Sequence, residues 1–341
     1  MDNKSLRGRR VVVIGTGGTI AGRATSALDN IGYSAAEVGI AELVRDLAPD
    51  GVTLLTEQVA QLDSKDMDFG VWQSLAERCA EWLALPDIDG IVITHGTDTL
   101  EETAYFLQSV LAPEKPVVLT CAMRPATALA PDGPQNVRDA VCIASGSADS
   151  TARGVSVVCA GRVHSALDVQ KVHTYRLDAF DSGDAGPIGH MEEGVLRRVR
   201  EWPLCDRTAA AQSLGRVRGL SADRWPRVEI VTSHAGASGR MIDALCGSTA
   251  AGAADEAGEA IDGLVIAATG NGSIHHSIEA AALRAQQAGV AVVRATRCVQ
   301  GRILPIAHAT LRDAGNLTPV KARIALMLEL MNKNEEPAPR R

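Results

Sequence analysis

The sequence predicts a two-domain α/β protein, with a larger N-terminal domain on a mostly parallel, doubly wound sheet and a smaller C-terminal α/β domain. Three observations lead to this fold class. Short β-branched runs alternate along the chain with helix-like segments, a pattern typical of strands buried between two layers of helices. Only 3% of the residues are aromatic, so the core has to consist mainly of aliphatic side chains. The 341 residues correspond to about two domains.

The expected strands are the short apolar runs, whose lack of alternation suits strands buried on both faces of a parallel sheet. They cover residues 11–14, 91–94, 117–120, 155–158, 228–231, 264–267 and 290–293. The expected helices lie between them, at residues 69–83, 99–109, 136–144, 239–246 and 277–287. The segment 196–226 is rich in arginine and has no long apolar run, so we expect a linker there between domains at 9–195 and 227–333.

Composition and charge argue against several classes of protein. The formal net charge of −7 argues against nucleic-acid binding, because phosphate recognition usually needs an excess of lysine and arginine. No apolar stretch approaches the roughly 18–20 residues of a membrane span. The first ten residues lack the apolar region of a signal peptide. This favours a cytoplasmic protein, although a secreted protein after signal removal would look similar.

Cysteine and histidine usage predicts no metal site. The seven cysteines are scattered, odd in number and without a Cys-x-x-Cys pair, which favours reduced, mostly buried thiols over disulfides or a zinc site. The eight histidines include the adjacent His275 and His276, but no pair at metal-ligand spacing on one helix face.

A glycine-rich loop at residues 14–22 follows the first expected strand. Gly15 and Gly17 match a dinucleotide fingerprint, but Ile20 stands at its third glycine position, and no Lys-Ser/Thr pair follows as in a phosphate-binding loop. The glycines suit a tight turn with positive φ. The hydroxyl of Thr19 lies at the end of a rigid strand, where a threonine is a nucleophile if a base is near. Both interpretations, a plain turn and a catalytic loop, stay open on this segment alone.

A second polar loop follows the strand expected at 91–94. Thr99 and Glu102 are expected to form a capping box at the start of the next helix. That role leaves Thr97 and Asp98 unexplained, and an unpaired aspartate at a strand end suits the ammonium group of a substrate.

Two further loops, taken alone, predict only ordinary roles. Ser64 or Asp66 is expected to cap the helix at 69–83. Lys171 is expected to be a solvated surface residue.

The two loops around Thr19 and Thr97, taken together, resemble the signature motifs of bacterial L-asparaginases, the family that also includes glutaminase-asparaginases. Intervening blocks resemble the family in the same order along nearly the whole chain. They are Glu57-Gln58-Val59 leading to Ser64, Ala122-Met123-Arg124-Pro125, Asp132-Gly133-Pro134, Asp168-Val169-x-Lys171 and Asn316-Leu317-Thr318-Pro319-x-Lys321-Ala322-Arg323. The resemblance implies a two-domain enzyme, usually a tetramer of two tight dimers. It also implies hydrolysis of L-asparagine to L-aspartate and ammonia, with no metal or organic cofactor.

The resemblance assigns a primary nucleophile with a tyrosine on a mobile lid, and a second group of hydroxyl, acid and lysine. These expected catalytic residues are Thr19, Tyr33, Thr97, Asp98 and Lys171. The expected substrate-binding residues are Gly18, Ser64, Lys65, Gly96, Thr97, Asp98 and Ser273, with Ser64 on the α-carboxylate and Asp98 on the α-ammonium. Lys65 stands where many relatives have a glutamine, and Ser273 replaces an asparagine of some strict asparaginases. Selectivity between asparagine and glutamine therefore stays open.

The implied chemistry needs a base, because a threonine hydroxyl is almost never ionised at neutral pH. Lys171 takes a proton only in its neutral form, which burial favours and the neighbouring Asp98 disfavours. Backbone N–H groups of the glycine-rich and Gly96–Thr97 loops are expected to form an oxyanion site. We favour Thr19 as the first nucleophile. The alternatives are a glutaminase-asparaginase, a related amino-acid amidase and a non-catalytic amino-acid binding protein.

Overall fold

The computed structural model describes residues 8–204, 206–247 and 261–333. The chain divides into two compact units, Met1–Asp223 and Arg224–Arg341. Both units are α/β, as the sequence predicts.

The N-terminal unit has, among its described residues, one sheet of eight strands. In spatial order they are β12 (Val195–Arg198), β11 (Gly189–Glu192), β8 (Arg162–Ser165), β7 (Val155–Cys159), β6 (Val117–Thr120), β5 (Gly90–Thr94), β1 (Arg9–Gly17) and β4 (Val52–Leu62). The five strands from β7 to β4 are parallel, whereas β8, β11 and β12 join the sheet antiparallel. The mostly parallel sheet is therefore confirmed.

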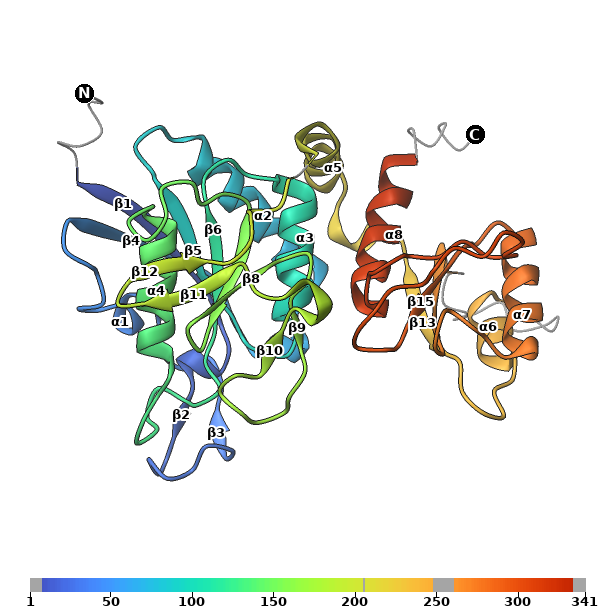
Figure 1. Cartoon of the computed structure of the whole chain (residues 1–341), viewed down its shortest axis with the longest axis horizontal. Helices are drawn as coiled ribbons and strands as arrows, with labels where there is room; N and C mark the ends of the chain where they lie inside the picture. Colours follow the sequence, from blue (N-terminus) through green and yellow to red (C-terminus); the bar gives the residue numbers. More distant parts are fainter. Residues whose placement is uncertain (1–7, 205, 248–260, 334–341) are drawn as a thin grey trace. The chain divides into compact units, whose positions relative to one another are not determined.

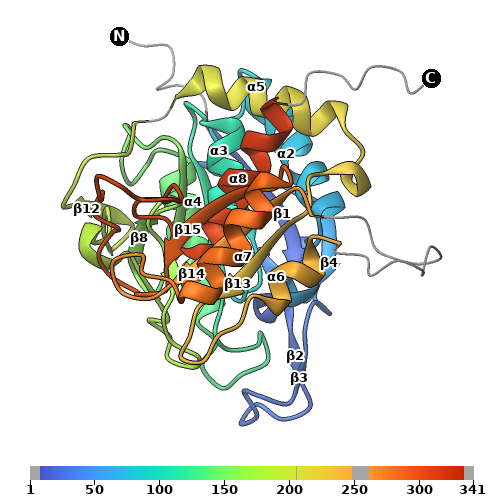
Figure 2. The same ribbon diagram turned by 90° about the vertical axis from the view of Figure 1, so that its right-hand side faces the viewer.

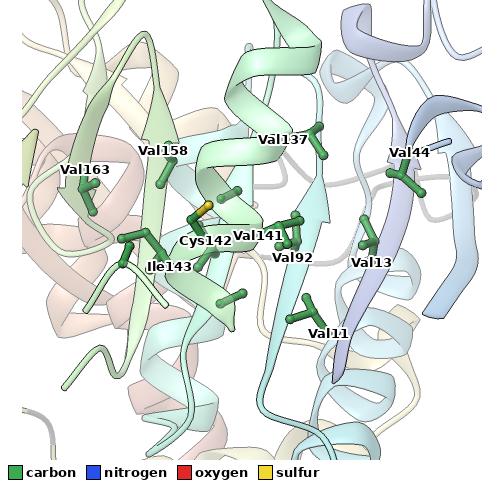
Figure 3. Packing of buried hydrophobic residues seen from close by; sticks show 14 of the residues in the cluster. Val11, Val13, Val44, Val92, Val137, Val141, Cys142, Ile143, Val158 and Val163 are labelled. Atoms are coloured by element: carbon green, nitrogen blue, oxygen red, sulfur yellow. The ribbon is translucent and has the colours of Figure 1, made fainter. Parts of the chain in front are cut away.

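Helices cover both faces of this sheet (Figure 1). They are α1 (Ile40–Leu43) and α4 (Gly133–Ala144) on one face, and α2 (Phe69–Ala84) and α3 (Leu100–Leu111) on the other. Alternate residues of a strand point to opposite faces, and Val11 and Val13 of β1 pack in one buried cluster with Val141 of α4 (Figure 3). On the other side of the sheet, Trp72 of α2 stacks on Phe106 of α3, with 4.9 Å between the ring centroids.

Short elements shape the loops of this unit. They are the strand pairs β2 (Arg23–Ala24) with β3 (Tyr33–Ser34) and β9 (Gln170–Lys171) with β10 (Phe180–Asp181), and the 3-10 turns η2 (Thr19–Ala21), η3 (Ser64–Asp66), η4 (Gly183–Ala185) and η5 (Ala222–Arg224). The first pair, a hairpin, carries the tyrosine that the sequence analysis assigns to a lid.

Helix α5 (Arg207–Gly219) lies inside the segment expected to be a linker. It packs on α3 and α2, and Gln73 of α2 donates hydrogen bonds of 2.7 and 2.9 Å to two carbonyl oxygens at its C-terminal end. Its buried residues are only Ala210, Ser213 and Val217, which explains why apolar runs do not reveal it. The compact N-terminal unit thus extends to Asp223. The division into 9–195, 196–226 and 227–333 stays a prediction.

The C-terminal unit has a smaller parallel sheet covered on both faces by helices (Figure 2). Its elements are β13 (Val228–Thr232), β14 (Gly263–Ala268) and β15 (Ala291–Thr296), in that spatial order, with α6 (Arg240–Leu245), α7 (His276–Gln287) and α8 (Pro319–Lys333). Ile242 of α6 and Ile278 of α7 pack with Leu264 of β14 in one buried cluster. Leucines of α8 lie against Gly263.

The seven expected strands and five expected helices all form, with ends shifted by a few residues. Four of the six described cysteines are buried, and none of the six is in a disulfide; they are Cys79, Cys121, Cys142, Cys159, Cys246 and Cys298. Cys205 lies outside the described residues. Within those residues, no helix is both long and apolar enough for a membrane crossing.

Candidate active site

The strand order identifies one point of the N-terminal sheet as a ligand site. β1 lies between β4 and β5, so strands are added in opposite directions from β1. Open α/β sheets bind ligands beside the carboxyl ends of the strands at such a switch point. The loops that follow β1 and β5 there carry Thr19 and Thr97.

Three loops meet at this point through glycines. Gly18 has a φ of 81°, and a Cβ on it would lie 2.3 Å from the Cα of Gly96. A Cβ on Gly96 would lie 2.4 Å from Ser64 Oγ. Only glycine permits such a close approach of backbones. The fold therefore brings together Gly18, Gly96 and Ser64, which the sequence analysis assigns to substrate binding.

The candidate nucleophile contacts the lid tyrosine. Thr19 is the first residue of η2, and 8% of its surface is exposed. Its Oγ1 lies 2.6 Å from the phenolic oxygen of Tyr33 on β3, and either hydroxyl can donate this hydrogen bond. The hairpin of β2 and β3 thus places Tyr33 in contact with Thr19 in this structure.

The second group forms around Lys171, which lies on β9. Its Nζ donates to Thr97 Oγ1 at 2.8 Å and pairs with Asp98 Oδ1 at 2.6 Å. The lysine side chain is 19% exposed and the aspartate 53%. An ammonium at this place donates to the threonine; once Lys171 is neutral, the same contact allows the threonine to donate to the lysine. The expectation of a solvated surface lysine is therefore wrong.

Glu101 holds the backbone of Lys171 in place. Its carboxylate oxygen Oε2 accepts a hydrogen bond of 3.0 Å from the Lys171 N–H. This contact joins the first turn of α3 to β9. Glu101 was not predicted from the sequence, because no local pattern links residues 70 positions apart.

Ser64 and Thr99 do not cap helices as expected. α2 is capped by Asp68, whose side chain accepts from the Val71 N–H at 2.8 Å. Thr99 stands at the N-cap position of α3 without a side-chain capping bond, because its hydroxyl donates to the carbonyl oxygen of Ser64 at 2.8 Å. Ser64 Oγ accepts from the Asp98 N–H at 3.1 Å. Both hydroxyls thus join the loop after β4 to the loop after β5.

Lys65 is paired with two acidic neighbours. Its Nζ lies 2.6 Å from Asp63 Oδ2 and 3.3 Å from Asp66 Oδ2, and its side chain is 60% exposed. Hydrogen bonds to these carboxylates, that to Asp63 first, raise the pKa of Lys65. Its positive charge is therefore locally neutralised.

A buried relay of hydrogen bonds fixes the peptide between Gly96 and Thr97. Trp72 Nε1 donates to Thr103 Oγ1 at 2.9 Å, and that hydroxyl lies 2.9 Å from His95 Nε2. His95 Nδ1 lies 2.7 Å from the Gly96 carbonyl oxygen, which only accepts, so the proton is on Nδ1. Burial lowers the pKa of His95 to about 4, which keeps the ring neutral.

This relay orients a backbone donor. A trans peptide points its C=O and N–H in opposite directions, so holding the Gly96 carbonyl on His95 turns the Thr97 N–H the other way. Among the described residues this N–H has no acceptor. It is therefore available to an oxyanion.

Ser273 belongs to the C-terminal unit. It is exposed, and it exchanges two backbone hydrogen bonds of 2.9 Å with Thr269. The N-terminal unit contains every other expected site residue. In the part of the chain that the structure describes, no group of three or more His, Cys, Asp or Glu side chains is placed to hold a metal ion.

Comparisons with known proteins decide the family. The model "Asparaginase, N-terminal" matches residues 10–203, and the model "Glutaminase/Asparaginase C-terminal domain" matches residues 227–341. The chain belongs to the asparaginase family. This asparaginase-family hydrolase resembles L-asparaginase 2 of Bacillus subtilis, with 35% identity over 95% of this chain and 83% of the relative.

Relatives of both specificities match this asparaginase-family chain equally well. The glutaminase-asparaginase of Pseudomonas fluorescens biotype A is 34% identical over 94% of this chain and 86% of the relative. The crystal structure of a probable cytoplasmic L-asparaginase from Campylobacter jejuni matches with a TM-score of 0.82 and 34% identity, covering 94% of this chain and 95% of that one. These similarities do not separate asparagine from glutamine as the substrate.

Proposed function

We propose that this protein hydrolyses the side-chain amide of L-asparagine to L-aspartate and ammonia, with Thr19 as the nucleophile. One observation carries the proposal: two hydroxyl-bearing groups, one around Thr19 and one around Thr97, meet at the carboxyl edge of the sheet. The similarity to L-asparaginase 2 of Bacillus subtilis supports this substrate.

The first step is attack on the amide carbon by Thr19 Oγ1. An amide is a poor electrophile, so the hydroxyl has to lose its proton as the new bond forms. The phenolic oxygen of Tyr33, at 2.6 Å, takes this proton while its own proton passes to the departing nitrogen. Ammonia leaves, an ester remains on Thr19, and water then cleaves the ester to release aspartate.

We favour Thr19 over Thr97 for attack because of their partners. Thr97 Oγ1 accepts a hydrogen bond from Lys171, and a positively charged donor lowers the nucleophilicity of the oxygen. The group around Lys171 suits the second step instead: Lys171 in its neutral form takes, through Thr97 Oγ1, the proton that water loses as it attacks the ester, and this proton then passes to the departing Thr19 oxygen. The Thr97 N–H stabilises negative charge on the former carbonyl oxygen.

The polar groups around Ser64 suit the amino-acid end of the substrate. Ser64 Oγ already accepts from the Asp98 N–H, so its own proton is free to bind the α-carboxylate. Asp98 Oδ1 is paired with Lys171, which leaves the second oxygen of this half-exposed carboxylate for the α-ammonium.

A glutaminase-asparaginase is the second candidate. The relative from Pseudomonas fluorescens carries that name and is 34% identical. Lys65, at the place of a glutamine in many relatives, and Ser273, at the place of an asparagine in some strict asparaginases, keep this candidate open. The homotetramer and the cytoplasmic location expected from the sequence stay predictions.

Ammonia release by the purified protein tests the proposal. L-asparagine and L-glutamine are supplied separately, and Thr19→Ala is assayed in parallel after its thermal unfolding has shown that it is folded. We expect turnover of asparagine that the substitution abolishes, with slower turnover of glutamine. Faster glutamine turnover would select the second candidate, and no ammonia from either substrate would refute the proposed reaction.

A further inference from the structure

Apart from the exposed ion pair of Arg23 with Glu42, 2.9 Å, and the contact of Tyr33 with Thr19, the lid hairpin (residues 22–34) meets the body of the N-terminal unit along one short segment. Figure 1 shows β2 and β3 extending from the carboxyl edge of the sheet. Residues 126–129, between β6 and α4, meet the lid through backbone hydrogen bonds from Ala126 N–H to the Gly22 oxygen, 3.0 Å, and from Leu129 N–H to the Ala27 oxygen, 2.9 Å. The lid thus has a defined docking seam.

Thr127 contributes the side-chain hydrogen bonds of this seam. Its hydroxyl accepts a hydrogen bond of 2.8 Å from the Ala24 N–H and lies 3.4 Å from the Ala24 carbonyl oxygen, to which it donates. One half-buried hydroxyl therefore binds both polar backbone groups of one lid residue. Among the described residues, no other side chain of 125–130 hydrogen-bonds the lid.

The residue that Thr127 holds is the one opposite the lid tyrosine. In the two-pair hairpin, Ala24 pairs directly with Tyr33, and opposed residues of an antiparallel pair lie about 5 Å apart. The phenolic oxygen of Tyr33 in turn lies 2.6 Å from Thr19 Oγ1. A shift of Ala24 is therefore passed directly to the contact with the nucleophile.

The segment behind Thr127 is rigidly anchored. Asp132 accepts hydrogen bonds of 3.0 Å from the Met123 and Arg124 N–H groups. The Arg124 guanidinium donates to the Ala130 oxygen at 3.0 Å. The seam is thus fixed to the start of α4.

The tip of the lid has little packing to hold it down. Leu28 and Ile31 are 80% and 79% exposed, so burial of apolar surface contributes little to closure. The exposed pair of Arg23 with Glu42 adds little, so closure depends mainly on the hydrogen bonds along the seam.

We infer that Thr127 is a positioning residue that holds the lid closed and so sets the place of Tyr33 against Thr19. The inference rests on the proposed function for its catalytic consequence. The lid contact itself is measurable without turnover.

Hydrogen–deuterium exchange tests, independently of activity, whether Thr127 holds the lid closed. Thr127→Val keeps the shape and removes the hydroxyl, Thr127→Ser keeps the hydroxyl, and Thr208→Val is the same exchange at an exposed position on α5. We expect residues 22–34 to exchange about three- to tenfold faster in Thr127→Val, the range that one net hydrogen bond sets. Thr127→Ser and Thr208→Val should match the parent. Unchanged exchange in Thr127→Val overturns the inference.

Kinetics test the link to Tyr33. Thr127→Val should lower kcat for asparagine by about three- to tenfold, and Thr127→Ser should restore it. In a Tyr33→Phe background, Thr127→Val should have no further effect, because the contact that it positions is already lost. Additive losses would contradict positioning through Tyr33. If the parent releases no ammonia, the proposed function fails, and hydrogen–deuterium exchange alone decides whether Thr127 holds the lid closed.

Discussion

Among single residues, Lys171 has the most demanding position. It is mostly buried, and its Nζ contacts one carboxylate and one hydroxyl. In the proposed mechanism this side chain has to accept a proton and return it while it keeps its contacts with Asp98 and Thr97.

Two substitutions of Lys171 distinguish a role of its positive charge from a role in proton transfer. Lys171→Arg keeps a cation with several donors but has no accessible neutral form, and Lys171→Met removes the charge. We expect both variants to lose about 10²- to 10⁴-fold in kcat, the usual contribution of a general base. Steady-state ammonia release from asparagine measures this. An arginine variant with a tenth or more of the parent kcat would argue that only the charge matters.

The sequence revealed the expected catalytic residues through their motifs, but not the residues that position them. Thr127 and Ala24 are 103 positions apart, and no local pattern marks such a pair. The Thr99 half of the expected capping box is absent for a related reason, since the Thr99 hydroxyl donates to a distant acceptor, the Ser64 carbonyl oxygen. Local sequence patterns fix short-range partners, whereas the fold decides the long-range ones.

At the scale of elements, the loops after β1 and β5 depend on two glycines in contact. Gly18 needs both its positive φ and its missing side chain, because a Cβ would meet backbone atoms of Gly96 at 2.3 and 2.4 Å. Backbone atoms cannot move aside like a flexible side chain. The loops therefore hold their positions only as long as both residues stay glycine.

Gly18→Ala should destabilise the protein and remove activity. We expect a loss of about 2 kcal/mol or more in unfolding free energy, from strain at positive φ and overpacking. Gly215→Ala on α5 is the matched control, since nothing lies within 4 Å of the added methyl group. This helical position should gain about 0.5–1 kcal/mol. Urea unfolding measures both, and a Gly18→Ala protein as stable as the parent would contradict the clash.

Element prediction succeeded where burial was uniform. The strands buried on both faces stood out as unbroken apolar runs, whereas β4, at the sheet edge, alternates with polar residues and was missed. α5 was missed because it buries few side chains and is held by a glutamine from α2. For α5 a local signal was present, since the Asp206 side chain caps the helix by accepting from the Thr208 and Ala209 N–H groups at 3.0 Å.

For the whole molecule, two buried histidines connect stability to pH. Burial lowers the pKa of both His95 and His164 to about 4. In the unfolded chain both titrate near 6.5. Since the unfolded state binds more protons between these values, stability is full above pH 6.5 and falls as the pH drops towards 4.

Unfolding free energy should therefore fall by a few kcal/mol between pH 6.5 and 5, at most about 1.4 kcal/mol per histidine and pH unit. Most carboxylates stay ionised in this range. His95→Gln should roughly halve the slope. Tryptophan fluorescence suits the measurement, because Trp72, Trp82 and Trp202 report on the N-terminal unit. A flat profile, or an unchanged slope in the variant, would contradict neutral buried histidines.

The contact between Gly18 and Gly96 also depends on the correct pairing of β1 with β5. In the native register, Val11 to Gly15 of β1 pair with Gly90 to Thr94 of β5, and the loops that follow these strands meet where neither Gly18 nor Gly96 carries a side chain. Only the native register lets the loops close, and only closed loops bring Thr19 and Thr97 together. If the proposed reaction takes place at this site, activity depends on correct pairing of β1 with β5, so an activity assay also reports on the assembly of the sheet.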